Sequence, residues 1–220
     1  LNSLPNNYVH YGALYKAFFP LLKLAYERFL SSGASHFKDY GSLSVFCESH
    51  TFWLNDYALF MALKEHFAGK SWLEWTPPYR NYRSVKFNKL NQTIKLSVEA
   101  QKFYQYLFYA QLKQLQKYSS SKAVQIMGDV PIFVSLDSAD VWANRQLFQL
   151  KKNGYPNSVA GVPPDYFSED GQLWGNPLYE WSIHEATGFK WWLERLRANL
   201  DFYDIIRLDH FRGFESYWSV

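Results

Sequence analysis

Residues 204–214 read DIIRLDHFRGF, a short apolar run that ends in Asp209, with Arg207 before this carboxylate and Arg212 after it. This order is typical of a buried parallel strand that carries a charged side chain to the open end of a barrel. A nearby cation favours the ionised form of a carboxyl group, so we expect Asp209 to be charged at neutral pH. An ionised, fixed aspartate in a cleft can act as a nucleophile toward an electrophilic carbon.

A second apolar run upstream also ends in an aspartate. Residues 123–129 read AVQIMGD, so Asp129 follows a strand-like segment as Asp209 does. Between the two runs, residues 187–203 place Phe189, Trp192, Leu193, Leu196 and Leu200 on one face at helical spacing. Strand, helix and strand in this order predict parallel β/α architecture, with both aspartates at the carboxyl ends of strands. Two plainer interpretations stay open, namely that Asp129 is a turn residue and that Asp209 is an ion-pair partner.

The first half of the chain is patterned as helices. Residues 8–31 predict an amphipathic helix, and residues 55–64 predict a second one with Asn55 or Asp56 as its N-cap. Residues 94–118 carry the longest helical pattern, with an apolar stripe that we expect to face the core. Residues 137–142, DSADVW, resemble an N-capped helical turn.

Residues 160–178 are rich in glycine, proline and aromatic side chains and predict a long loop. Loops of this length in compact domains are usually functional or disordered, and disordered segments are poor in aromatic residues. Two interpretations therefore remain. The loop presents aromatic side chains over a cleft, or it is an Ω-loop that packs on its own aromatic residues.

The composition excludes several classes of protein. The net charge of +3 and the scattered lysines do not favour nucleic-acid binding. The single cysteine, Cys47, rules out an internal disulfide and a cysteine metal cluster, and it fits a cytoplasmic location. The sequence contains no run of about 18 apolar residues, so it predicts no membrane span. No two histidines have the spacing of metal ligands. Aromatic residues make up 20% of the chain, an excess that suits flat ligands such as sugar rings.

Five short motifs follow one another in the second half of the chain. They read GDVPIFV at 128–134, DSADVW at 137–142, GVPPDYF at 161–167, LWGNPLY at 173–179 and RLDHFRGF at 207–214. Together they resemble the 4-α-glucanotransferases, also called amylomaltases or disproportionating enzymes, which are relatives of the α-amylases. The resemblance is strong from about residue 123 onward and weaker before it.

This resemblance implies part of a (β/α)8 barrel with helical insertions that acts on α-1,4-glucans and maltooligosaccharides by a retaining double displacement. Residues 1–220 would form a partial catalytic domain, with 8–118 largely helical and 123–220 carrying barrel strands and the active-site loop. No metal or organic cofactor is implied. The oligomeric state does not follow from the sequence.

The resemblance also implies roles for individual residues. Asp209 matches the catalytic nucleophile of the family, and Arg207 matches the arginine that keeps this nucleophile ionised and in place. Asp129 matches a carboxylate of the subsite for the sugar under attack. The remaining substrate-binding residues implied are Tyr166 and Phe167 at the tip of a flexible loop, Trp174 and Asn176 at the cleft wall, and His210, to which the motif assigns no role.

Two carboxylates of the family are expected beyond Val220, namely the general acid/base glutamate and a second aspartate that binds the transition state. The chain also begins without a methionine and ends in an aromatic stretch, so we expect it to be cut at both ends. We therefore expect the isolated piece to be inactive and marginally folded, because an incomplete barrel leaves strand edges unpaired. The alternatives are a carbohydrate-binding protein without catalysis and an α-glucan hydrolase on the same barrel.

Overall fold

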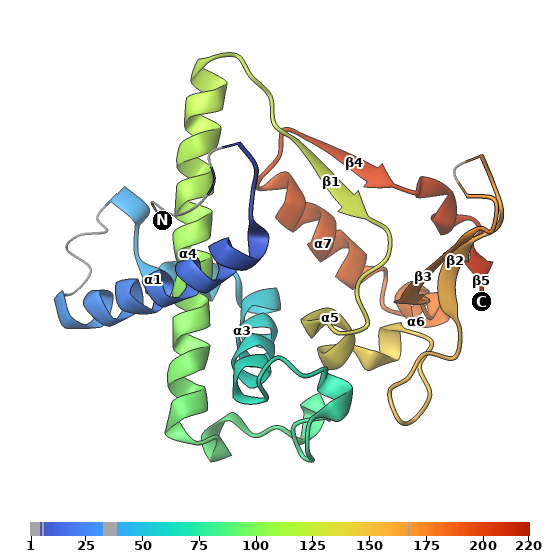
Figure 1. The fold of residues 1–220 in the computed structure, drawn as a ribbon, viewed down its shortest axis with the longest axis horizontal. Coiled ribbons are helices and arrows are strands. Elements are labelled where there is room, and N and C mark those ends of the chain that lie inside the picture. Colours follow the sequence, from blue (N-terminus) through green and yellow to red (C-terminus); the bar gives the residue numbers. More distant parts are fainter. Residues whose placement is uncertain (1–4, 6, 33–38, 167) are drawn as a thin grey trace.

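The computed structural model describes residue 5 and residues 7–32, 39–166 and 168–220. Helices fill the described chain as far as Ser121, and the strands follow it (Figure 1). The helices are α1 (Tyr11–Ser32), α2 (Leu43–Ser49), α3 (Thr51–His66), α4 (Gln92–Ser121), α5 (Ala139–Ala143), α6 (Trp181–Ala186) and α7 (Lys190–Leu200). The strands are β1 (Met127–Pro131), β2 (Val159–Val162), β3 (Gln172–Pro177), β4 (Ile205–Asp209) and β5 (Trp218–Ser219).

The long helix α4 is the axis of the helical part, with α1 crossing it and α3 packed beside it (Figure 1). It begins at Gln92, two residues before the predicted stretch 94–118, because the side chain of Asn91 accepts a hydrogen bond from the backbone N–H of Ile94 at 2.9 Å and so caps the first turn. The predicted N-cap of α3 is wrong. The helix begins at Thr51, and Asp56 lies inside it, where its carboxylate accepts a hydrogen bond from the Tyr82 hydroxyl at 2.6 Å.

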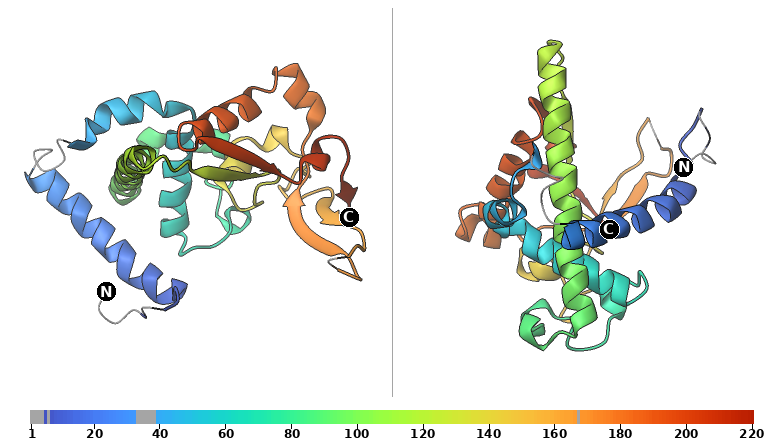
Figure 2. Two further views of the ribbon diagram at one scale, coloured as in Figure 1. Left: turned by 90° about the horizontal axis from the view of Figure 1, so that it is seen from above. Right: turned by 90° about the vertical axis from the view of Figure 1, so that its left-hand side faces the viewer.

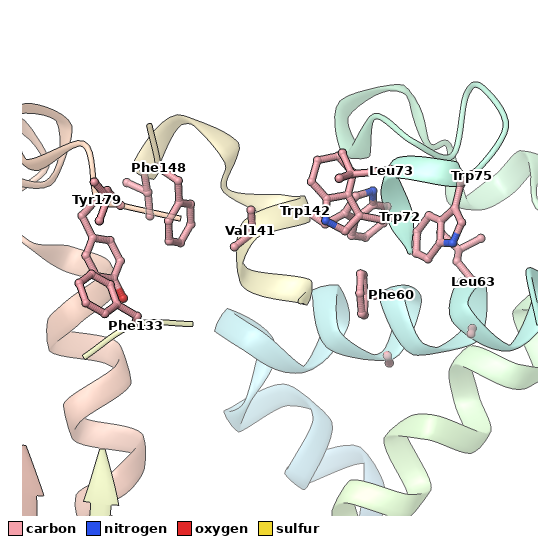
Figure 3. Packing of buried hydrophobic residues seen from close by; sticks show 14 of the residues in the cluster. Phe60, Leu63, Trp72, Leu73, Trp75, Phe133, Val141, Trp142, Phe148 and Tyr179 are labelled. Atoms are coloured by element: carbon pink, nitrogen blue, oxygen red, sulfur yellow. The ribbon is translucent and has the colours of Figure 1, made fainter. Parts of the chain in front are cut away.

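An aromatic core joins α3 and α5 to the segment between α3 and α4 (Figure 3). Trp72, Trp75 and Trp142 are at most 1% exposed. Buried indole N–H groups need acceptors, and all three have one. The acceptors are backbone carbonyl oxygens of Leu136, Lys70 and Tyr79, respectively, at 2.8–3.0 Å. The predicted helical turn at 137–142 is part of this core as α5, which Ser138 caps.

The strands β1 and β4 pair in parallel, which confirms the pairing predicted from the two apolar runs. The chain between them includes α5, β2, β3, α6 and α7, and α7 packs on β4. The strand β1 begins four residues later than predicted, so Asp129 lies inside the strand and not after it. Residues 123–126 are taken up by the turn that leaves α4, where Ala123 adopts a positive φ of 54°. Of the predicted apolar stripe on α7, Trp192 is buried, whereas Leu193 is 46% exposed, because a two-stranded sheet covers little of a helix.

Residues 160–178 are not the loop that the sequence predicts but largely a β-hairpin. Strands β2 and β3 pair antiparallel, and β5 pairs with the other edge of β2. The hairpin lies at the same end of the molecule as the C-terminus (Figure 2). Gly171 makes the return possible, since it has a φ of 73° and a Cβ atom there would lie 2.5 Å from the Val162 carbonyl oxygen.

The described part of the chain is therefore mixed α/β, with one parallel strand pair joined through helices. Among these described residues, no helix combines the length and the apolar character that crossing a lipid bilayer requires.

Candidate active site

Three charged side chains share the open face of the β1–β4 pair. Side chains alternate between the two faces of a strand, so Asp129, Arg207 and Asp209 project to one side, and the alternate residues Val130 and Leu208 project to the other. Val130 is buried, whereas the side chains of Asp129, Arg207 and Asp209 are 50%, 62% and 57% exposed. We call these three residues the charged trio.

The register of the two strands places Arg207 directly opposite Asp129. The guanidinium group donates two hydrogen bonds to this carboxylate, from Nε to Oδ1 at 3.0 Å and from Nη2 to Oδ2 at 2.6 Å. These bonds hold the pKa of Asp129 below its usual value. Asp209 lies farther away, with its Oδ1 atom 3.7 Å from Arg207 Nη2. Arg207 therefore binds Asp129 through both Nε and Nη2, and only its Nη2 atom approaches Asp209.

The strand pair can form this arrangement because Gly128 has no side chain. The ring of Tyr203, just before β4, occupies the place where a Cβ atom on Gly128 would stand. Close approach of this ring brings the start of β4 against β1. The pair is also tied at its entrance, where the Asp204 carboxylate accepts a hydrogen bond from the Ile126 backbone N–H at 2.8 Å.

An open cleft of ≈ 640 Å³ begins next to the charged trio, at the carboxyl end of β4. His210 directly follows Asp209 and adopts a positive φ of 51°, which turns the chain into this cleft. The His210 ring meets the Trp174 ring edge-on, with centroids 5.0 Å apart. The structure thus brings together two of the predicted site residues from segments that are 36 positions apart in the chain.

The other predicted site residues are placed differently. Asn176 donates a hydrogen bond from its side chain to the Val134 carbonyl oxygen at 2.8 Å, so it ties β3 to the segment after β1. Tyr166 is fully exposed near the tip of the hairpin. Phe167 lies outside the described residues.

Sequence reasoning missed several residues at this site. Gln172, Arg212 and Tyr217 line the cleft, and the Gln172 side chain accepts a hydrogen bond from the Trp174 indole N–H at 3.0 Å. Arg195 on α7 donates to the carbonyl oxygens of Pro131 and Ile132 at 2.6 and 3.3 Å, and so holds the carboxyl end of β1. A signal for Gln172 existed. It stands two positions before Trp174, and such positions share a face if the segment is a strand.

The donor set at the site consists of carboxylates, guanidinium groups and aromatic rings. Among the residues that the structure describes, no three His, Cys, Asp or Glu side chains are grouped as metal ligands would be. The arrangement suits a ligand that offers hydroxyl groups to the charged trio and an apolar ring face to the aromatic wall of the cleft.

The chain is similar to known proteins of one family. Residues 2–220 match the family described as 4-alpha-glucanotransferase, and the chain belongs to this family. A 4-alpha-glucanotransferase from Clostridium butyricum is 44% identical over 213 residues, which are 96% of this chain and 42% of that protein. A 4-alpha-glucanotransferase from Solanum tuberosum, named as chloroplastic/amyloplastic, is 41% identical over 219 residues, which are 99% of this chain and 38% of that protein.

A solved structure is also similar. The amylomaltase from Streptococcus agalactiae, solved in complex with acarbose, superposes with a TM-score of 0.83 at 37% sequence identity. The match covers 96% of this chain and 42% of that protein. The chain thus spans less than half the length of these relatives.

Proposed function

We propose that the complete polypeptide containing this chain is a 4-α-glucanotransferase, which moves α-1,4-glucan segments between maltooligosaccharide or glucan chains. The observation that carries the proposal is the charged trio on two parallel strands, next to the aromatic cleft at the carboxyl end of β4, in a chain of this family. Such strand ends are where barrel enzymes assemble their active sites.

The chemistry proposed is a retaining double displacement. The Asp209 carboxylate attacks the anomeric carbon of the donor, and the bond from that carbon to the glycosidic oxygen breaks while an acid protonates this oxygen. The 4-hydroxyl of an acceptor sugar then attacks the glycosyl-enzyme, gives up its proton to the same group, now a base, and releases Asp209. The acid/base must stand about 5–5.5 Å from the nucleophile, and we assign it to the polypeptide that follows Val220.

The remaining residues support this reaction. Arg207 holds Asp129 by two hydrogen bonds, so Asp129 is oriented to accept hydrogen bonds from sugar hydroxyls in the subsite of the attacked sugar. Trp174 and His210 form a wall for sugar rings in the cleft. Asn176 positions β3, and the role proposed for Tyr166 and Phe167 from the family resemblance is contact with the acceptor. We further propose that β1 and β4 are neighbouring strands of a (β/α)8 barrel, whose interior is the open face that carries the charged trio.

The test is to incubate the complete polypeptide with maltotriose and to separate the products by length. Glucose together with chains longer than maltotriose is the expected result. Asp209→Asn should remove both products, because the amide is not a nucleophile, and a circular dichroism spectrum should stay unchanged.

Two outcomes would redirect the proposal. Only glucose and maltose would identify a hydrolase, and an unchanged substrate with retained binding would identify a carbohydrate-binding protein. We expect the 220-residue piece alone to be inactive, and detectable transfer by it would contradict the placement of the acid/base. A cytoplasmic location stays a prediction from the single cysteine, since a plant relative is named as chloroplastic/amyloplastic.

A further inference from the structure

A second, smaller groove of ≈ 200 Å³ lies between α3 and α4 on one side and α5 and α7 on the other. We call it the helical groove. Among the described residues, none that lines it also lines the cleft beside the charged trio. In Figure 1, α3 and α4 lie on the opposite side of α7 from β2, β3 and β5, which supply residues of the cleft. The helical groove is therefore a separate site.

The first wall of the helical groove is aromatic. Phe52, Trp53 and Tyr57 from α3 and Tyr109 from α4 line it, and Trp191 lines the facing side from α7. Trp53 and Tyr109 are stacked, with centroids 5.6 Å apart and an interplanar angle of 18°. Phe52 is 45% exposed although it stands beside these rings. Tyr109 is only 8% exposed, so Phe52 is the ring that offers an exposed apolar face to a flat ligand.

The second wall is polar and acidic. Asp140 on α5 and Glu194 and Arg195 on α7 line it, and Asp56 on α3 adds a third carboxylate to the groove. Asp140 accepts a hydrogen bond from the Trp191 indole N–H at 3.1 Å, which fixes one carboxylate next to one ring. Asn144 and Asn199 add amide groups. An excess of carboxylates disfavours phosphates and other anions, and it provides acceptors for hydroxyl groups.

One donor in the helical groove lacks a partner. The indole nitrogen of Trp53 is buried, and it has no hydrogen-bond partner among the residues that the structure describes. Buried donors are nearly always paired, so an unpaired one calls for an explanation. Because protein atoms cover this nitrogen, it does not itself contact a ligand in the groove, and the binding surface consists of the side chains of the two walls.

We propose that the helical groove binds one glucosyl unit of an α-glucan, away from the site of transfer. A pyranose ring presents C–H groups to aromatic faces and hydroxyl groups to carboxylates and amides, and it needs both kinds of wall. The volume is below the roughly 300–1,000 Å³ of a typical small-molecule pocket, so it suits a single sugar ring. The choice of an α-glucan over other sugars rests on the proposed function. A long glucan held there would be kept near the enzyme during successive transfers.

The test follows the tryptophans individually. The complete polypeptide, in the Asp209→Asn background so that sugar is not consumed, is labelled with 5-fluorotryptophan and titrated with maltotriose by ¹⁹F NMR. The chain has 9 tryptophans, and Trp53→Phe and Trp174→Phe assign the two resonances that matter. Trp53 reports on the helical groove and Trp174 on the cleft. Sorbitol, a polyol without a ring face, is the control ligand.

The expected result is a saturable shift of the Trp53 resonance with maltotriose and none with sorbitol. Phe52→Leu should weaken this binding about 10-fold, since stacking on an aromatic face is lost. Phe87→Leu is the matched control, because Phe87 is 47% exposed and lies outside the helical groove. Unchanged positions of the other tryptophan resonances show that each variant is folded. In the enzyme with Asp209 intact, Phe52→Leu should raise KM for amylose and leave turnover of maltotriose unchanged.

The outcomes separate this inference from the proposed function. A shift of Trp174 without a shift of Trp53 overturns the inference and leaves the proposed function standing. A saturable shift of Trp53 without one of Trp174 supports the helical groove and counts against the cleft. Equal shifts with sorbitol, or equal weakening by Phe52→Leu and Phe87→Leu, would also overturn the inference.

Discussion

The aromatic core around α3 and α5 and the charged trio on β1 and β4 are built on opposite principles. Trp72, Trp75 and Trp142 are at most 1% exposed, and each indole donor is bonded to a backbone carbonyl. The side chains of the charged trio are at least half exposed. Burial removes apolar area from water and stabilises the fold, whereas a solvated ion pair contributes little. We therefore expect the stability of the fold and the proposed chemistry to depend on different regions, and substitutions should separate them.

The largest expected effect is in the core. Trp142→Ala should lower the free energy of unfolding by about 3–5 kcal/mol, because the indole leaves a cavity that its neighbours cannot fill. Urea denaturation of the complete polypeptide measures this loss. Trp218→Ala is the control, since Trp218 is 55% exposed and should cost about 1 kcal/mol or less. Equal losses for the two variants would contradict the view that the core carries the stability.

The second prediction concerns the charged trio. Arg207→Gln should reduce kcat/KM for maltotriose disproportionation on the order of 100-fold, as when a preorganised electrostatic group is removed from an active site. The urea midpoint should hardly move, because the ion pair with Asp129 is exposed. Arg197→Gln, on the last turn of α7, serves as the control. A large loss of stability with little loss of activity would assign Arg207 a structural role.

The third prediction tests the packing that joins the two strands carrying the charged trio. Gly128→Ala should lower the free energy of unfolding by about 1–3 kcal/mol, because the new methyl group collides with the Tyr203 ring and pushes β1 from β4. Gly12→Ala, in the first turn of α1, has room for its methyl group and should stabilise by up to about 1 kcal/mol. Tyr203→Leu should partly rescue Gly128→Ala, and a lack of rescue would show that another contact is responsible.

The smallest expected effect is the pH dependence of His184. Its ring is fully buried, its Nε2 atom is 3.2 Å from the Leu147 carbonyl oxygen, and its Nδ1 atom has no partner within the described structure. Burial lowers the pKa of His184 below its ordinary value of 6.5, so the unfolded chain binds the proton more readily. Stability from this group is thus constant above about pH 6.5 and falls as the pH drops below it.

The measurement is the urea midpoint at pH values of about 7.5 and 5.5, on either side of the unfolded pKa. The midpoint should fall on acidification, and it should fall less in His184→Gln, which keeps a donor for Leu147. The control must not disturb packing, which rules out replacing the exposed His66, because its ring contacts Phe67 and Tyr79. Lys190→Gln, on the exposed start of α7, is preferable. An identical pH response of wild type and His184→Gln would exclude the histidine as its cause.

Local patterns predicted much of the fold. The apolar runs that end near Asp129 and Asp209 predicted a parallel strand pair, and the helical periodicity around residues 94–118 predicted α4. The predictions of secondary structure failed where contacts with residues distant in the sequence override the local conformational preference. The glycine- and proline-rich segment 160–178 forms strands because its two arms and β5 supply hydrogen-bond partners. Asp56 does not cap α3, since it is engaged by Tyr82.

The family and the residue types of the candidate site could be predicted from the chain alone, because short motifs keep their order whatever surrounds them. The register of β1 against β4 decides which carboxylate Arg207 binds, because it places Arg207 opposite Asp129. The approach of Trp174 to His210 and the two walls of the helical groove likewise join segments far apart in the chain. Spacing along the sequence describes one strand or one helix at a time, whereas sites form where several of them pack.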